Sequence, residues 1–363
     1  MNPCRSISAW LVASPIRGAA LPGLVLAGAV LALGIPRYGW VNPYIQMVLV
    51  YIGINIILAG SLNLVNGYMG EFSVGHAGFM AVGAYTASVL TFKVFHLAGA
   101  SWLFPVAIVA GGLAAAVCGL LVAIPSFRTR GDYLAIVTLA FLMIVKSVIE
   151  NTSYVEGASG LFGMKRLTTL PWVYFWMVVT LWVIRNFIYS KYGRGMLAIR
   201  EDELAADLMG VRTRRVKILV FMLSSFFAGV AGGLYAHYLQ YISPRSFDIL
   251  KSTDILIMVY LGGVASLGGS ILGATLYQVL LEVLRPSTFN EAFQWLPAPL
   301  FQWLSDHVFN QLDIWRMLIM PLLLILVMLY RPRGILGLRE WPLLVPERDR
   351  PGKRPSAGKG GGA

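Results

Sequence analysis

The chain has 363 residues, of which 57% are hydrophobic and only 13% are charged, and its mean hydropathy is +0.70. A soluble domain carries about 25% charged residues, so this composition excludes an ordinary soluble globule. The formal net charge of +12 would suggest nucleic acid in a soluble protein. Here no basic patch is interleaved with base-stacking aromatic residues, so we expect no nucleic-acid partner and relate the charge to membrane topology instead.

Successive apolar runs predict an all-α, polytopic integral membrane protein. A spanning helix needs about 20 apolar residues, and no soluble domain fits between the runs. In chain order they are 18–36, 44–65, 72–92, 102–125, 133–149, 170–189, 218–242, 255–281 and 315–331. Arg5 and Arg17 precede the first run as in a signal peptide, but no small-residue cleavage site follows, so we expect a retained helix.

The run 255–281 is too long for a simple crossing. As one helix it would extend about 40 Å, whereas the hydrocarbon core is about 30 Å thick. Glycines lie in pairs at its centre, Gly262-Gly263 and Gly268-Gly269, and such a cluster favours a break. The run is therefore either one tilted helix or two short arms joined by a turn.

The distribution of Lys and Arg decides between these alternatives. The loop 190–217 holds seven of them and the tail from residue 331 holds eight, so both segments are predicted to be cytoplasmic. An even number of crossings must separate them, which requires two arms from 255–281. The result is a bundle of about ten crossings with both termini inside the cell and with the loops 150–169 and 283–314 outside.

The same rule predicts the organisation of the chain. We expect a cytoplasmic N-terminus at 1–17, a transmembrane domain at 18–335 and a basic, disordered cytoplasmic tail at 336–363. The basic tail is suited to contact anionic membrane lipid. Within the external loop 283–314, apolar residues recur at helical spacing from Leu300 to Leu312. This pattern predicts an amphipathic interfacial helix or a docking surface for an external protein.

Motifs for chemistry are missing. There is no GxxxxGK[ST] loop, so the chain has no visible means of hydrolysing ATP, and neither GxSxG nor HExxH occurs. The four histidines, His76, His96, His237 and His307, form no close-spaced ligand pair. We therefore expect no enzyme, no catalytic residue, no metal and no cofactor. No ionisable group lies deep in an apolar run, which disfavours a proton-driven carrier.

A short helix is predicted inside the polar loop 190–217, from Asp202 to Met209. Acidic Glu201, Asp202 and Glu203 suit the positive end of its dipole, and Gly210 stands where a left-handed C-terminal cap is wanted. Its apolar face is formed by Leu204, Ala205, Leu208 and Met209. The helix either lies on the membrane or on its own domain, or it is presented to a cytoplasmic partner, with small Ala205 and Ala206 permitting close approach.

Polar residues and glycines interrupt the apolar pattern between Leu62 and Phe79. At membrane depth they are tolerated only against protein or water. Candidate broken-helix or translocation-path residues are Asn66, Gly70, Ser73, Gly75 and His76. Close helix packing is predicted from small residues at Ala77, Ala81, Ala84 and Ser88, and from the GxxxG pairs Gly229/Gly233 and Gly269/Gly273.

Several of these stretches, in order, resemble the LivM-type permease subunits of branched-chain amino acid ABC transporters. The matching blocks are Leu62–Ser88, Arg128–Phe141, Tyr192–Gly210, Leu223–Ala236, Leu261–Gly273 and Arg331–Gly334. The resemblance implies an ABC importer permease fold in the bacterial inner membrane. It also implies three kinds of partner: a second, related permease, two ATP-binding subunits that use the ATP, and a periplasmic substrate-binding protein.

The resemblance further implies that 190–217 couples ATP hydrolysis to alternating access. The importer motif for this loop is Glu-Ala-Ala-x3-Gly. Ala205, Ala206 and Gly210 match it, whereas Leu204 occupies the Glu position and Glu203 lies one residue earlier. The alternatives left open are a related importer for urea, amides, other amino acids or apolar carboxylates, a stand-alone secondary transporter, and a membrane enzyme.

Overall fold

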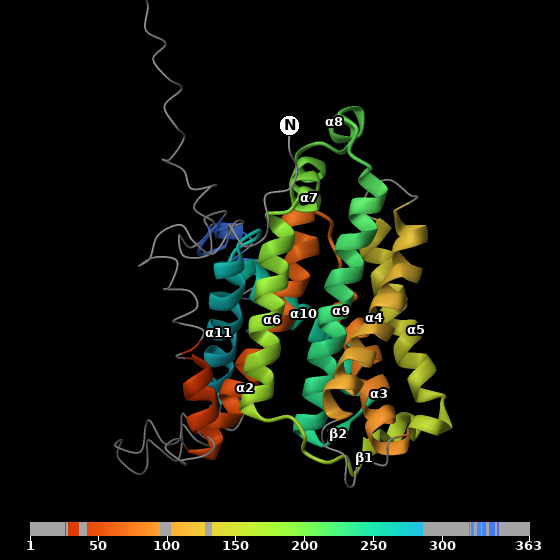
Figure 1. Cartoon of the computed structure of the whole chain (residues 1–363), viewed down its shortest axis with the longest axis vertical. Helices are drawn as coiled ribbons and strands as arrows, with labels where there is room; N and C mark the ends of the chain where they lie inside the picture. The colour runs from red at the N-terminus through yellow and green to blue at the C-terminus, as the bar shows by residue number, and fades with distance from the viewer. Residues whose placement is uncertain are drawn as a thin grey trace, which may run out of the picture.

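A computed structural model describes residues 26, 28–35, 42–94, 103–127 and 133–285, with short pieces between 319 and 340. The predicted N-terminal segment 1–17 lies outside these residues, as does the predicted external loop 283–314 beyond residue 285. The described part is a bundle of helices with one pair of two-residue strands (Figure 1).

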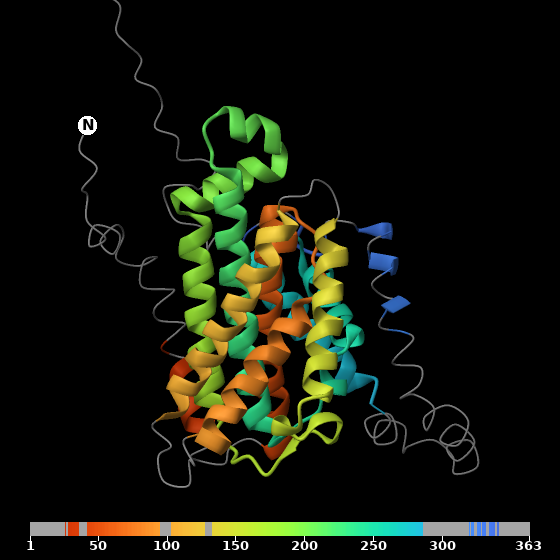
Figure 2. The same ribbon diagram turned by 90° about the vertical axis from the view of Figure 1, so that its right-hand side faces the viewer.

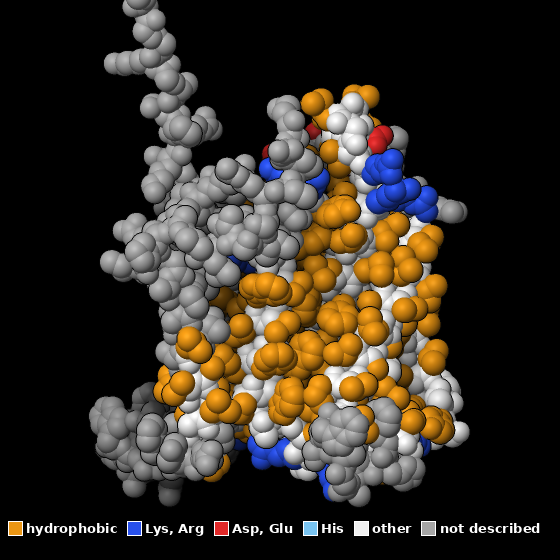
Figure 3. Space-filling model, in the orientation of Figure 1, with side chains coloured by type: hydrophobic (Ala, Val, Ile, Leu, Met, Phe, Trp, Pro, Cys, Tyr) orange, Lys and Arg blue, Asp and Glu red, His pale blue; other side chains and the backbone are white. Residues whose placement is uncertain are grey.

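Six helices among the described residues are long and apolar enough to cross a membrane. Two of them include a π-helical segment: α2 (Pro43–Asn63) continues into η2 (Leu64–Met69), and α3 (His76–Val89) continues into η3 (Leu90–Val94). The other four are α4 (Phe104–Ser126), α5 (Tyr133–Glu150), α6 (Leu170–Ile188) and α9 (Thr213–Leu239). Apolar side chains cover the visible flank of the bundle, and basic side chains gather near its ends (Figure 3). The predicted helical membrane fold is confirmed, and the number of ten crossings stays a prediction.

The two ends of the bundle differ. At one end α7 (Lys191–Glu201) and α8 (Glu203–Leu208) project beyond the other helices (Figures 1 and 2). At the opposite end β1 (Leu161–Phe162) pairs antiparallel with β2 (Tyr241–Ile242). Three 3-10 turns complete that end, namely η5 (Ser153–Val155), η6 (Gly157–Ser159) and η7 (Pro244–Phe247). The loops 150–169 and 190–217 thus lie on opposite ends, as the charge distribution predicts.

Small residues allow α3, α4 and α9 to pack closely. The predicted stripe of Ala77, Ala81, Ala84 and Ser88 is buried. Across from it, a methyl group on Gly232 of α9 would lie 2.0 Å from the carbonyl oxygen of Met80. Only a residue without a side chain permits this approach, so the small-residue pattern acts in helix packing as predicted.

The run 255–281 is broken into two antiparallel arms, α10 (Ile249–Gly262) and α11 (Leu267–Val283). Asn63, at the end of α2, holds the turn between them. Its amide nitrogen donates to the Ser266 carbonyl at 2.9 Å and to the Ser270 hydroxyl at 2.8 Å, and its oxygen accepts from the Ala265 N–H at 3.0 Å. The prediction of two arms joined by a turn at the glycine cluster is therefore confirmed.

A C-terminal segment packs on the same turn. The N–H groups of Ile335 and Leu336 donate to the carbonyls of Leu261 and Gly262, at 3.0 and 3.1 Å. The Glu340 carboxylate accepts from the Leu267 N–H at 2.7 Å, at the start of α11, and from the Tyr68 hydroxyl. The predicted tail boundary at 336 thus falls within a segment that contacts the hairpin, whereas residues 341–363 lie outside the described part.

Candidate functional site

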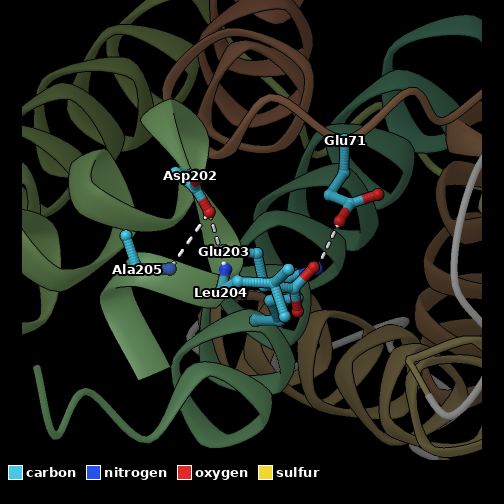
Figure 4. A network of polar contacts seen from close by, with 6 residues as sticks. Glu71, Asp202, Glu203, Leu204 and Ala205 are labelled. Carbon is cyan, nitrogen blue, oxygen red and sulfur yellow. Dashed lines mark hydrogen bonds and ion pairs between the residues drawn. The ribbon is translucent and has the colours of Figure 1, made fainter. Parts of the chain in front are cut away.

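The short helix predicted in the loop 190–217 is α8. Asp202 is its N-cap, and the Asp202 Oδ1 atom accepts from the N–H groups of Leu204 and Ala205 at 2.9 and 3.0 Å (Figure 4). Gly210 follows its end with a φ of +82°, the left-handed conformation that the sequence predicts. One placement was wrong: Glu201 does not begin this helix but ends α7, a separate helix that the sequence analysis missed.

α8 turns its large apolar side chains away from the bundle. Leu204, Leu208 and Met209 are 63%, 88% and 85% exposed, and Figure 3 shows apolar side chains at this projecting tip. The two alanines of the motif face different surroundings: Ala205 is exposed, whereas Ala206 is only 4% exposed and packs on the core. An exposed apolar group on a projecting helix is typical of a contact surface for another protein.

Lys217 links α8 to the broken segment after α2. Its ammonium lies 2.8 Å from Glu203 Oε2 in α8 and 2.6 Å from Glu71 Oε1, which follows η2 (Figure 4). The Lys217 side chain is largely buried, whereas the Glu203 carboxylate is half exposed, so water screens the pair with Glu203 more than the pair with Glu71. Glu203 was a predicted site residue, whereas Glu71 and Lys217 were not. The signal for Glu71 was available, since a carboxylate between two apolar runs needs a partner.

The break predicted between Asn66 and His76 is present. The helical backbone ends at Met69, Gly70 turns the chain with a φ of +80°, and α3 begins only at His76. Asn66 and Ser73 close this loop reciprocally. The Asn66 amide donates to the Ser73 carbonyl at 3.3 Å, and the Ser73 N–H donates to the Asn66 oxygen at 3.2 Å. Polar groups at this depth are thus satisfied by protein.

The end of the broken segment is fixed against two neighbouring helices. A methyl group on Gly75 would lie 2.1 Å from the Thr138 carbonyl oxygen in α5. The Nε2 atom of buried His76 lies 2.9 Å from the Ser61 hydroxyl in α2. The same hydroxyl lies 2.9 Å from the Leu58 carbonyl oxygen, so Ser61 joins His76 to the backbone of α2.

The five predicted path residues therefore meet in one folded segment. Asn66, Ser73 and His76 are buried, Gly75 packs on α5, and Gly70 is exposed and lies against Arg200 of α7. The segment touches both the projecting helices and the bundle interior. That these residues line a path stays a prediction.

The other described histidine also serves packing. The Nδ1–H group of His237 donates to the Gly233 carbonyl at 2.8 Å, so its Nε2 atom accepts from the Thr91 hydroxyl at 2.7 Å. This joins α9 to η3. His96 and His307 lie outside the described residues. Across the described ranges no group of three His, Cys, Asp or Glu residues is arranged to hold a metal ion.

These features define a multi-pass helical membrane protein that presents a short helix with exposed apolar side chains outside its bundle. A family model for the permease component of branched-chain amino acid transport systems matches residues 44–328, and the chain belongs to this family. The resemblance seen in the sequence is thereby confirmed.

Individual relatives agree with the family. The high-affinity branched-chain amino acid transport permease LivM of Escherichia coli is 34% identical, over 78% of this chain and 68% of its own length. LivM of Salmonella typhimurium is 33% identical over the same shares. LivH of Escherichia coli, a permease of the same named system, is 28% identical over 52% of this chain and 54% of its own length. These relatives are transport permeases rather than enzymes. No solved structure matches the chain.

Proposed function

We propose that the chain is the permease subunit of an ATP-binding-cassette importer for branched-chain, hydrophobic amino acids. It works in the bacterial inner membrane with a second homologous permease, two ATP-binding subunits and a periplasmic substrate-binding protein. ATP is used by the partner subunits, and this chain holds no cofactor. The end that carries α8 faces the cytoplasm, which agrees with the concentration of Lys and Arg in the loop 190–217.

One observation carries the coupling part of this proposal: α8 is exposed to partners and is also tied to the broken segment. Leu208 and Met209 face outward, whereas Glu203 shares the Lys217 ammonium with Glu71. A displacement of α8 by a docked ATP-binding subunit would therefore act on the loop that precedes α3. A partner drives such a change only if it binds the two states of the bundle with different affinity.

The substrate class rests on the family and on the names of the relatives. A zwitterionic amino acid cannot cross hydrocarbon unaided, because its charges would have to leave water. Selectivity need not come from tight binding in the bundle, since an external binding protein supplies it. Support for a second permease comes from the similarity to both LivM and LivH.

Reconstitution tests the proposal directly. The purified chain, a second permease, the ATP-binding subunits and the binding protein are placed in proteoliposomes with labelled leucine. We expect ATP-dependent uptake by the full set and none by this chain alone. Uptake by the chain alone would instead indicate a secondary transporter, and uptake of urea, amides or apolar carboxylates in place of leucine would assign another substrate class.

A docking variant tests the role of α8 separately. Leu208→Glu places a charge on a side chain that is 88% exposed, so it should not disturb the fold. We expect it to abolish co-purification of the ATP-binding subunits and uptake. The matched control is Leu239→Gln, an exposed leucine at the other end of α9, which should retain both. Normal co-purification with Leu208→Glu would contradict docking on α8.

A further inference from the structure

Aromatic rings from several elements gather in the half of the bundle opposite α8. Tyr235 of α9 is at their centre: its ring centroid lies 6.3 Å from that of Tyr51 in α2 and 6.1 Å from that of Phe247 in η7. The ring of Tyr85 in α3 lies 6.2 Å from Phe247. Phe247 is buried, whereas Tyr51 and Tyr235 are partly exposed. These rings form an apolar cluster that comes from four different elements.

Two opposite charges adjoin the same rings. The Lys251 ammonium lies 5.8 Å from the centroid of Tyr235, and Asp254 interacts electrostatically with both Lys251 and Tyr235. Lys251 and Asp254 are three residues apart on α10, which places them on one helix face. Both are partly exposed. Ionisable residues within a membrane bundle that face its interior are costly, and they commonly mark a substrate route.

The Tyr85 hydroxyl adds a hydrogen-bonding group without a partner. Tyr85 is 5% exposed, and its oxygen makes no hydrogen bond to any described residue. Most buried polar groups are hydrogen-bonded, so one that is not asks for an explanation. A group that binds a passing ligand in another state of the bundle is one such explanation.

We propose that Lys251, Asp254, Tyr85, Tyr235 and Phe247 form a contact site for a zwitterionic amino acid with an apolar side chain. In the state described, Lys251 and Asp254 attract each other. When substrate enters, Lys251 turns to its carboxylate and Asp254 to its ammonium, so no charge is left unpaired. The aromatic rings receive the apolar side chain, and the Tyr85 hydroxyl binds the carboxylate. This inference rests on the proposed function and adds a site within this chain.

Tyr85→Phe is the sharpest test because it should not harm the fold. The substitution keeps the ring and removes an unpaired hydroxyl, so thermal stability should be unchanged or higher. In the reconstituted importer, with saturating binding protein, we expect leucine uptake to fall about threefold to tenfold, the value of one hydrogen bond. The control Tyr154→Phe alters an exposed tyrosine at the same end of the bundle and should transport normally.

The charges are tested in the same assay. Lys251→Gln and Asp254→Asn should each reduce uptake about tenfold or more, because a charge-assisted hydrogen bond is lost. Lys251→Arg keeps the charge and should recover part of the rate. The matched control is Arg285→Gln, which breaks a different ion pair, Arg285–Glu282, at the end of α11. If Lys251→Gln fails to accumulate in the membrane, the uptake by Tyr85→Phe decides whether the contact site stands.

The outcomes separate this site from the function on which it rests. If the unaltered importer takes up no leucine, both proposals are overturned. If it does so and any one inserted variant among Tyr85→Phe, Lys251→Gln and Asp254→Asn keeps the unaltered rate, the contact site alone is overturned. Reduced uptake in all three, with both controls normal, supports it.

Discussion

Gly83 of α3 and Gly229 of α9 meet backbone to backbone: a methyl group added to Gly83 would lie 2.2 Å from the Cα atom of Gly229. Between membrane helices the hydrophobic effect contributes little, so stability depends on such close van der Waals contact. We expect Gly83→Ala to lower the free energy of unfolding by about 1–3 kcal/mol. Thermal unfolding in detergent measures the loss.

Gly60 provides the control for this prediction. It is buried in α2, but a methyl group there would have its nearest neighbour, Ile184 Cδ1, at 3.8 Å. Alanine also favours a helix over glycine by about 1 kcal/mol. Gly60→Ala should therefore preserve or raise the melting temperature. Equal losses in both variants would show that the close contact of α3 and α9 is not the cause.

The bridge made by Lys217 predicts unequal coupling to its two carboxylates. The side chain of Glu71 is 22% exposed, whereas that of Glu203 is 52% exposed. An exposed ion pair contributes about 0–1 kcal/mol, and a more buried, charge-assisted hydrogen bond about 1.5–3 kcal/mol. Double-mutant cycles with Lys217→Met should therefore give a larger coupling energy for Glu71→Gln than for Glu203→Gln.

For Glu203 we expect a larger effect on uptake than on stability. Glu203→Gln should leave stability nearly unchanged and still reduce leucine uptake, since it releases α8 from the loop before α3. A Glu203→Gln variant that transports normally would remove this ion pair from the coupling route. The conservative Glu203→Asp control tests whether charge alone suffices.

The sequence alone predicts both the membrane helices and the hairpin of α10 and α11. Hydropathy is a local property, so the apolar runs mark α2 to α6 and α9. The break in 255–281 follows from counting positive charges on either side of it. The polar helix α7 carries no such signal, because its residues Lys191–Glu201 include two glycines and alternate charges with apolar residues.

Contacts between distant residues were beyond sequence reasoning. Glu71 and Lys217 are 146 positions apart, and nothing local pairs them. The same limit explains the motif alanines: sequence spacing places Ala205 and Ala206 together, yet which of them faces a partner depends on how α8 packs. Gly210 was identified as a helix C-cap and as the glycine of the family motif, and Glu203 as an acidic residue at the helix start, one position before the Glu of that motif. Neither signal reveals which residues they contact.

Gly210 should be required for coupling. Its φ of +82° is unfavourable for other residues by about 1–2 kcal/mol, and its N–H donates to the Asp207 carbonyl at 2.9 Å. Proline would remove that donor and impose a negative φ. We expect Gly210→Pro to abolish uptake and to reduce co-purification of ATP-binding subunits, with membrane insertion intact.

Gly163 is the matched control for Gly210. It has a φ of +81° in the loop at the opposite end, and a methyl group there would meet nothing closer than 3.9 Å. Gly163→Ala and Gly210→Ala thus impose similar backbone strain at opposite ends. Only Gly210→Ala should weaken co-purification of the ATP-binding subunits, and equal binding by both variants would refute a role of the α8 cap in docking.

The two motif alanines should respond differently to bulk. Ala205 is exposed, so Ala205→Trp should keep the melting temperature while blocking a close-fitting partner. Ala206 is buried, so Ala206→Trp should lower the melting temperature as well as uptake. Melting and co-purification are measured on the same preparations. Loss of stability in Ala205→Trp would mean that this side of α8 packs on the chain itself.

Asp248, at the end opposite α8, predicts a specific pH dependence of stability. A hydrogen bond from the Lys146 ammonium at 2.8 Å, and another from the Ile249 N–H, hold the pKa of the Asp248 carboxyl below its ordinary value of 3.8. A carboxyl with a lowered pKa in the folded state stabilises the folded state at pH values above the ordinary pKa, and this stabilisation is lost as the pH falls through the folded-state pKa.

Asp248→Asn should therefore melt at a lower temperature than the unaltered chain at pH 7, and the difference in melting temperature should shrink from about pH 4 downward. The control Glu282→Gln alters a carboxylate that pairs with Arg285 at the end of α11, so it leaves the Lys146–Asp248 pair in place. A gap between Asp248→Asn and the unaltered chain that stays constant between pH 7 and pH 3 would show that the stabilisation does not come from the ionised carboxylate.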